Sequence, residues 1–203
     1  VIYRNANRMN YLINELLTFS KIEMKQMRIS VRKGDIMHFL EELSHIFDIV
    51  AGEREIDFIV NLEDTEEEVW FSPSKLERIL YNLLSNAFKY TQPGGYVKLS
   101  AKLIKEEKGT FVQISVKDNG RGIPKEAQEQ IFESYYQVEK RDHREGFGLG
   151  LSLTRSLIHM HKGEIRVESE INKGSDFIVT LNVSEDAYNP DERSSENLSL
   201  IHI

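Results

Sequence analysis

Two asparagines and a lysine could together hold a metal-bound phosphate on one side of a predicted helix. Asn82, Asn86 and Lys89 are spaced four and three residues apart, which places them along one helical face. Magnesium prefers oxygen ligands and keeps several of its waters, so one or two amide oxygens beside phosphates would suffice. Taken alone, the segment is equally well explained as a solvent-facing polar side of a helix.

Three later segments have the composition of ligand-binding loops. Asp118-Asn119-Gly120-Arg121-Gly122 follows a predicted strand, so its carboxylate could accept a hydrogen bond from an exocyclic amine while the glycines permit close approach. Gly146-Phe147-Gly148-Leu149-Gly150 precedes a predicted helix, whose free N–H groups favour an anion. It is neither a Rossmann fingerprint nor a Walker A loop. Gly174-Ser175 completes the set, although each segment alone could be a plain turn.

The elements that must position these residues follow from hydrophobic periodicity. A helix over 73–90 begins with proline in its first turn and turns Leu80, Leu83 and Leu84 inward. Alternating patterns predict strands at 96–104, 110–118, 164–169 and 176–183, and a helix begins near Phe147 and ends before Gly163. The candidate residues therefore fall at the ends of strands and helices.

Upstream, the pattern predicts an amphipathic helix over residues 2–27, a short half-buried strand that starts at Met27 and stops at Gly34, and one helix over 36–50. Short strands follow at 55–60 and 69–71. After Ser184 the chain is acidic and polar, which is typical of a linker or frayed tail. Blocks of helices and strands without strict βαβ repetition favour an α+β fold, a two-layer sandwich with helices on one face of a mixed, mostly antiparallel sheet.

Net charge, cysteine content and the length of apolar runs exclude several classes of function. The 203 residues carry a formal net charge of -7, which argues against a general nucleic-acid binder. The absence of cysteine excludes disulfides and thiolate chemistry. No apolar run approaches the ~20 residues that span a bilayer, so we expect no membrane contact by this segment.

Together and in this order, the four segments resemble the N, G1, G2 and G3 boxes of the sensor histidine-kinase catalytic domain, which belongs to the GHKL ATPase superfamily and has the Bergerat fold. Ile131 to Gln137 looks like the F box of the same domain. Residues 1–27 resemble the second helix of the dimerisation and phosphotransfer region, which forms a four-helix bundle in a homodimer. The resemblance implies three parts: 1–27 a partial dimerisation helix, 28–183 the ATP-binding domain, and 184–203 a linker or disordered tail.

The resemblance implies Mg²⁺ and ATP as ligands, with roles for the residues of the helix over 73–90. Asn86 would be the principal magnesium ligand, and Asn82 would bind or orient the waters of the metal. Lys89 would meet the phosphates, and Tyr90 would pack near the base.

The loop residues have implied roles as well. Asp118 would accept a hydrogen bond from the adenine amino group, and the backbone at Gly120 and Gly122 would close over the purine. The segment 133–147 would form an ATP lid, in which Arg141 or Arg144 reaches the γ-phosphate. The remaining nucleotide-binding positions would be Gly146, Gly148, Leu149, Gly150 and Ser175.

In such a kinase the γ-phosphoryl passes to a histidine in a short motif on the first dimerisation helix. None of the six histidines here has that context, and His159 and His161 read as surface or packing residues, so we expect no autophosphorylation by this chain alone. We expect a cytoplasmic domain of a membrane-anchored parent, with a response-regulator receiver domain as partner. The alternatives are a non-catalytic relative that uses ATP as a structural signal, and another GHKL ATPase, which would usually carry a carboxylate in place of Asn82.

Overall fold

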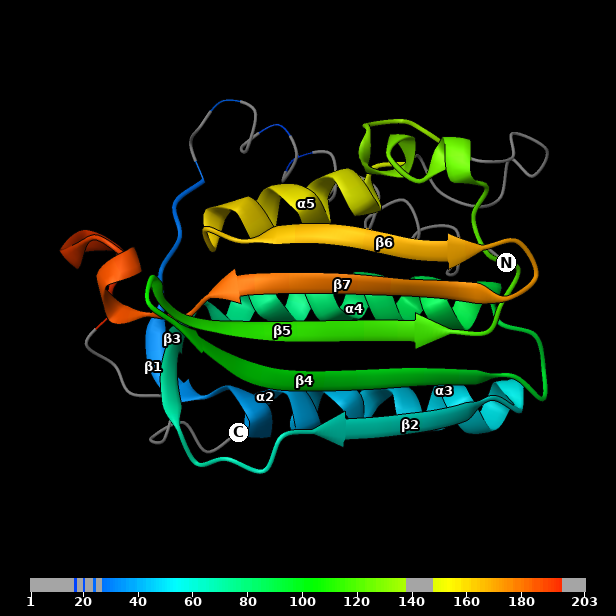
Figure 1. Ribbon diagram of the computed structural model, residues 1–203, viewed down its shortest axis with the longest axis horizontal. Coiled ribbons are helices and arrows are strands. Elements are labelled where there is room, and N and C mark those ends of the chain that lie inside the picture. The colour runs from blue at the N-terminus through cyan, green and yellow to red at the C-terminus, as the bar shows by residue number, and fades with distance from the viewer. Residues whose placement is uncertain (1–16, 18–19, 21–23, 25–26, 138–147, 195–203) are drawn as a thin grey trace.

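The computed structural model describes residues 17, 20, 24, 27–137 and 148–194. Its centre is a five-stranded sheet with the strand order β2-β4-β5-β7-β6 (Figure 1). Only β2 and β4 pair in parallel, and the other neighbours are antiparallel. The strands are β2 (Asp57–Leu62), β4 (Tyr96–Glu106), β5 (Gly109–Asp118), β6 (Glu164–Glu170) and β7 (Gly174–Asn182).

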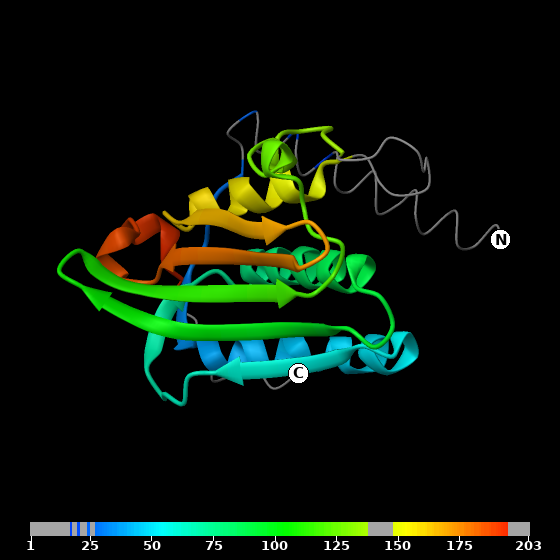
Figure 2. The same cartoon turned by 45° about the vertical axis from the view of Figure 1, so that its right-hand side comes forward.

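Four helices cover one face of this sheet, as Figures 1 and 2 show. They are α2 (Ile36–Ser44), α3 (Ile46–Arg54), α4 (Pro73–Tyr90) and α5 (Gly150–Met160). Alternate residues of the central strands pack against the helices, and this core includes Leu80, Leu83 and Leu84 of α4. The predicted α+β sandwich is therefore confirmed, as is the inner face of the helix over 73–90.

The single helix predicted over 36–50 is in fact two helices that meet at His45. The hydroxyl of Ser44 bonds the carbonyl of Glu41, and the N–H of Asp48 bonds the carbonyl of His45, so the backbone tightens to i→i+3 spacing at the junction. The second helix is turned as a result, and Ile46 is 55% exposed rather than part of the core.

A small second sheet lies at one end of the molecule, where β1 (Arg32–Asp35) pairs antiparallel with β3 (Glu68–Phe71). The strand predicted to run from Met27 to Gly34 is confirmed only in its second part, because residues 27–30 form no ladder and Val31 makes one isolated bridge, to Arg193. Ile29 and Val31 are nevertheless buried, which explains the alternating pattern. The helix predicted over 2–27 falls almost entirely outside the described residues.

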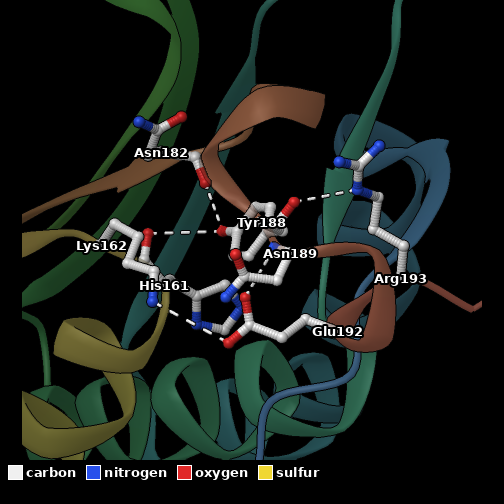
Figure 3. Close-up of polar contacts among 7 residues, drawn as sticks. All are labelled: His161, Lys162, Asn182, Tyr188, Asn189, Glu192 and Arg193. Atoms are coloured by element: carbon white, nitrogen blue, oxygen red, sulfur yellow. Dashed lines mark hydrogen bonds and ion pairs between the residues drawn. The ribbon is translucent and has the colours of Figure 1, made fainter.

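The segment 185–194 packs at this same end, and we name it the C-terminal clasp (Figure 3). It contains the short 3-10 turns η3 (Glu185–Ala187) and η4 (Pro190–Glu192). Tyr188, only 1% exposed, donates its hydroxyl to the carbonyl of Asn182. The N–H of Val31 bonds the carbonyl of Glu192 at 2.8 Å. As far as Ser194 the expectation of a linker or frayed tail is therefore wrong, and residues 195–203 lie outside the described part.

Among the described residues, no helix combines the length and apolar character needed to cross a membrane.

Candidate functional site

The polar side of α4 lies against the first turn of α5. The Asn82 amide nitrogen donates to the Thr154 hydroxyl at 2.7 Å. Gly150, the first residue of α5, is so near that a Cβ there would lie 2.7 Å from the Asn82 amide oxygen. Asn82 and Asn86 are both half-buried, on the side of α4 opposite to Leu80, Leu83 and Leu84. The structure therefore brings the predicted N and G2 segments together.

At the C-terminal end of α4, two cations meet one aromatic ring. The Lys89 ammonium lies 4.8 Å from the centroid of the Tyr90 ring, and the Arg121 guanidinium carbon lies 4.3 Å from the same centroid. Arg121 belongs to the loop after β5, so this contact joins the N segment to the G1 segment. The sequence marked Lys89 and Tyr90 as candidates but gave Arg121 no role.

Asp118, the last residue of β5, is a buried carboxylic acid with 5% of its surface exposed. Its Oδ1 accepts the Gly120 N–H at 2.8 Å. Burial raises the pKa of the Asp118 carboxyl above its ordinary value, while hydrogen bonds from the backbone N–H groups of Gly120 and Ser175 oppose the rise. The Asp118 carboxyl is therefore a hydrogen-bonding group that is largely shielded from water.

Two glycines of the G1 loop occupy positions that no other residue fits. A Cβ on Gly120 would lie 2.4 Å from the Tyr90 carbonyl oxygen, so the loop runs directly over the end of α4. Gly122 has φ +70°, and a Cβ there would lie 2.0 Å from the Glu170 carbonyl oxygen. These contacts are with the backbone of the protein, so the sequence prediction that the two glycines permit close approach of a ligand stays a prediction.

The turn between β6 and β7 supports the G1 loop from the other side. The Ser169 hydroxyl accepts the Ile123 N–H at 2.8 Å and lies 3.0 Å from the Ser175 hydroxyl. The Gln128 amide donates to the carbonyls of Ile123 and Ser169. The sequence analysis named Ser175 as a candidate. It did not name Ser169 or Gln128, because these two residues belong to no motif and their hydrogen bonds to the G1 loop and to β6 are formed only in the folded chain.

The G2 segment is described from Gly148 onward. The Gly148 carbonyl accepts the Tyr135 N–H at 3.0 Å, which ties it to the predicted F box. The Leu149 side chain is buried, so any contact of this residue with a ligand would come from its backbone. The 3-10 turns η1 (Lys125–Ala127) and η2 (Gln130–Phe132) lie beside the start of α5 (Figure 2). Arg141, Arg144 and Gly146 lie outside the described residues, as does most of the predicted lid.

The helix predicted to begin near Phe147 starts at Gly150, and Ser152 bonds back to the Leu149 carbonyl in its first turn. Within the described ranges, no cluster of three His, Cys, Asp or Glu side chains could hold a metal ion. Candidate metal ligands here are the amide oxygens of Asn82 and Asn86, which are of the hard type that magnesium prefers.

All of these segments lie at one end of the sandwich. The C-terminal ends of α4 and β5, the first turn of α5 and the β6–β7 turn gather there, opposite to the C-terminal clasp (Figure 1). A buried carboxylic acid, glycine-containing loops, a helix N-terminus and a stripe of amides and cations are the groups expected of a candidate site for a purine nucleotide with its phosphates. The fold and this site define an ATP-binding domain of the two-layer α+β class.

Comparison with known proteins places the chain in a family. Residues 71–185 match the family described as histidine kinase-, DNA gyrase B-, and HSP90-like ATPase. Because the match covers more than half of the chain, the chain belongs to this family. Within the family its relatives are sensor histidine kinases, so it is a histidine-kinase ATP-binding domain.

The chain is similar in sequence to several curated proteins. It is 34% identical to the sensor histidine kinase WalK of Bacillus subtilis over 92% of this chain and 30% of that protein. It is 35% identical to the adaptive-response sensory kinase SasA of Crocosphaera subtropica, over 89% of this chain and 47% of that protein. The chain thus spans less than half the length of these relatives.

Solved structures share the fold. The catalytic domain of the histidine kinase ThkA, in a nucleotide-free form, has a TM-score of 0.67 at 26% identity, over 79% of this chain and all of that one. Full-length ShkA in complex with AMPPNP has a TM-score of 0.79 at 25% identity, over 89% of this chain and 37% of that one.

Proposed function

We propose that this domain binds Mg²⁺ and ATP at the end of the sandwich formed by α4, β5 and α5, and presents the γ-phosphoryl to a histidine on a dimerisation helix. The acceptor histidine would lie outside this chain. The parent would act as a homodimer, with the domain in the cytoplasm, and would pass the phosphoryl group to a receiver domain. ShkA, a relative of this fold, was solved with AMPPNP, which supports the nucleotide part.

The observation that carries the proposal is the buried Asp118 carboxyl at the end of β5, followed by a loop that contains Gly120 and Gly122. A buried carboxylic acid is costly unless its oxygens are hydrogen-bonded, and two backbone N–H groups meet only part of that need. An adenine amino group would supply a further donor. Gly120 and Gly122 would let the loop backbone lie close to the purine, with Tyr90 packing near it and Ser175 beside Asp118.

The α4 stripe would hold the metal and the phosphates. The Asn82 amide nitrogen donates to Thr154, so its oxygen would serve as the acceptor for a ligand or a metal-bound water beside Gly150. Asn86, one turn later on the same side, would be the principal magnesium ligand. Magnesium when bound would neutralise phosphate charge.

Lys89 would contribute its ammonium to the phosphates. Arg144 or Arg141 of the lid would reach the γ-phosphate, and the backbone at Gly146, Gly148, Leu149 and Gly150 would face the phosphates at the start of α5. Phosphoryl transfer depends mainly on positioning and charge neutralisation, so this set of groups suits it.

A hydrolytic ATPase is the less favoured candidate. Activation of water requires a group that accepts a proton near neutral pH, and a carboxamide does not. Asn82, hydrogen-bonded to Thr154, occupies the position where the other GHKL enzymes usually place a carboxylate.

Calorimetric titration with a non-hydrolysable ATP analogue tests the proposal. We expect saturable one-site binding with magnesium, weaker binding with EDTA, and loss of measurable binding in Asp118→Asn. Asp186→Asn is the matched control, because Asp186 is exposed on η3 in the C-terminal clasp at the opposite end of the sheet and has no proposed role. No binding by the folded chain up to millimolar analogue would contradict the proposal.

A further inference from the structure

Two residues of α5 lie against the carboxamide of Asn82. The amide nitrogen donates to the Thr154 hydroxyl at 2.7 Å, and a Cβ on Gly150 would lie 2.7 Å from the amide oxygen. Gly150 and Thr154 are four residues apart on α5, so both lie on the side of this helix that faces α4. The start of α5 therefore holds the Asn82 side chain at both of its polar ends.

The oxygen of this carboxamide is the end nearer to the first residue of α5. A Cβ on Gly150 would lie 2.7 Å from the Asn82 oxygen and 3.2 Å from its nitrogen. The N–H groups in the first turn of a helix attract anions, so the phosphates of a nucleotide bound at this end would gather near that oxygen. An amide oxygen can accept a hydrogen bond from a metal-bound water, whereas an amide nitrogen cannot.

Water cannot easily take the place of the Thr154 hydroxyl. Thr154 is only 1% exposed, whereas Asn82 is half-buried. Without the hydroxyl, the amide nitrogen of Asn82 would satisfy its hydrogen bonds by turning toward solvent, and the oxygen would leave its position beside Gly150. We expect this turn to cost little stability, because part of Asn82 already contacts solvent, but it changes which atom faces the ligand.

We infer that Thr154 is a positioning residue, which acts through Asn82 and keeps the amide oxygen of Asn82 available to the magnesium-phosphate part of the ligand. The inference rests on the proposed function of the site. The buried Thr154 side chain need not touch the nucleotide to have this effect. Loss of its hydroxyl weakens the part of nucleotide binding that depends on magnesium and leaves the remainder unchanged.

Calorimetric titration of Thr154→Val with the non-hydrolysable ATP analogue, once with magnesium and once with EDTA, tests this role. Valine resembles threonine in shape and in helix propensity, so α5 should keep its packing. We expect the dissociation constant with magnesium to rise roughly tenfold, as for other groups that orient a metal ligand, and that with EDTA to change less than about twofold. Thr154→Ser keeps the hydroxyl and should restore most of the affinity.

A double-mutant cycle separates positioning from a merely structural role. Because Thr154 acts through Asn82, Thr154→Val should add nothing to the loss of affinity that Asn82→Ala causes with magnesium. Ser156→Ala is the matched control, since it removes a hydroxyl that bonds the Ser152 carbonyl on the same helix. We expect the control to leave both dissociation constants unchanged. Thermal unfolding of each variant verifies the fold.

The nucleotide-free chain gives a readout that needs no metal. The side-chain amide signal of Asn82 in a proton–nitrogen NMR spectrum is identified by its loss in Asn82→Ala. We expect this signal to shift in Thr154→Val and to return toward its original position in Thr154→Ser, because only the latter keeps the hydrogen bond. The same signal should not move in Ser156→Ala.

The inference alone would be overturned by equal losses of affinity with magnesium and with EDTA, by additive losses in the double variant, or by an unchanged affinity of Thr154→Val. An Asn82 signal that stays in place in Thr154→Val would also overturn it. Absence of binding by the unmodified chain, or an affinity that magnesium does not change, would contradict the proposed function and the inference with it.

Discussion

The imidazole of His161 is fully buried and must be neutral in the folded protein. Its Nε2 accepts the Ser72 N–H at 3.2 Å, so the proton sits on Nδ1, which lies 3.0 Å from the Leu157 carbonyl oxygen. A second proton on Nε2 would face the Ser72 N–H, donor against donor. Burial, with a smaller contribution from the nearby charge of Lys75, lowers the pKa of His161 to about 4, although the hydrogen bond to the Leu157 carbonyl opposes the shift.

The depressed pKa of His161 predicts a loss of stability in mild acid. The unfolded chain takes up a proton on this residue below about 6.5 and the folded chain only near 4, so the stabilisation is complete above pH 6.5. It is lost as the pH falls from 6.5 toward 4, at up to about 1.4 kcal/mol per pH unit and on the order of 3 kcal/mol in all.

Urea unfolding of the chain and of His161→Gln at pH 7, 6 and 5 measures this effect. Gln cannot titrate, so we expect the variant to be less stable at pH 7 and its free energy of unfolding to depend less on pH. Carboxylates contribute equally to both curves and cancel in the comparison. Parallel curves would show that His161 does not titrate as inferred.

At the scale of single residues, the sequence indicated which residues could bind a ligand or pack in the core, but not which groups surround them in the fold. His159 and His161 were predicted to be surface or packing residues, and they are exposed and buried respectively. Asp118 was chosen from its place after a strand. The partner of His161, in contrast, is a backbone N–H 89 positions away, and no local pattern encodes such a contact.

The C-terminal clasp is the element that most changes the description of the domain. Arg193 donates to the Tyr188 carbonyl at 2.9 Å and pairs with Glu185 at 2.8 Å, while Asn189 and Glu192 form a capping box. Ser194 bonds back to Val31 at 2.8 Å. The clasp thereby holds Val31, which lies in the segment directly before β1.

We expect Tyr188→Phe to lower the free energy of unfolding by about 1–2 kcal/mol, because the buried Asn182 carbonyl would lose its hydroxyl donor without gaining water. Tyr188→Ala should cost about 3–5 kcal/mol through the cavity it leaves. Urea unfolding measures both. Tyr81→Phe, at a ring that is 49% exposed, should change stability by less than about 0.5 kcal/mol. A Tyr188→Phe cost no larger than that of Tyr81→Phe would mean that the clasp is not integral to the fold.

The packing of 185–194 was not predicted, because the acidic and polar composition of this segment is typical of a linker. Its stability comes from one aromatic side chain and several hydrogen bonds, not from an apolar run. A signal was nevertheless present: Asn189-Pro190-Asp191-Glu192 has the N-cap, first-turn proline and acidic third position of a capped turn. The predicted bounds of α4 agree with the structure because Pro73 marks its start, whereas the break at His45 has neither glycine nor proline to mark it.

At the scale of the whole molecule, the candidate nucleotide-binding residues and the C-terminal clasp lie at opposite ends of the sheet. One end carries the Asp118 loop, the end of α4 and the start of α5, and the other carries the clasp and the β1–β3 pair (Figure 1). The four segments indicated one shared site because, in this order, they resemble the N, G1, G2 and G3 boxes of the histidine-kinase catalytic domain. The support that Ser169 and Gln128 give to that site depends on strand register, which the sequence does not specify.

This separation predicts where nucleotide should change local dynamics. With magnesium and a non-hydrolysable ATP analogue at saturation, hydrogen exchange should slow in peptides that cover 118–124 and 148–154, because ligand contacts would oppose local opening there. Exchange in 184–194 should stay unchanged at short labelling times, since these residues touch no proposed ligand position. The Asp118→Asn variant, which should not bind the analogue, serves as the control, and its exchange should slow in neither 118–124 nor 148–154. Slowing of equal size in the clasp would mean that the two ends are energetically coupled through the sheet. The effect of nucleotide binding would then extend to Val31, which the clasp contacts directly before β1.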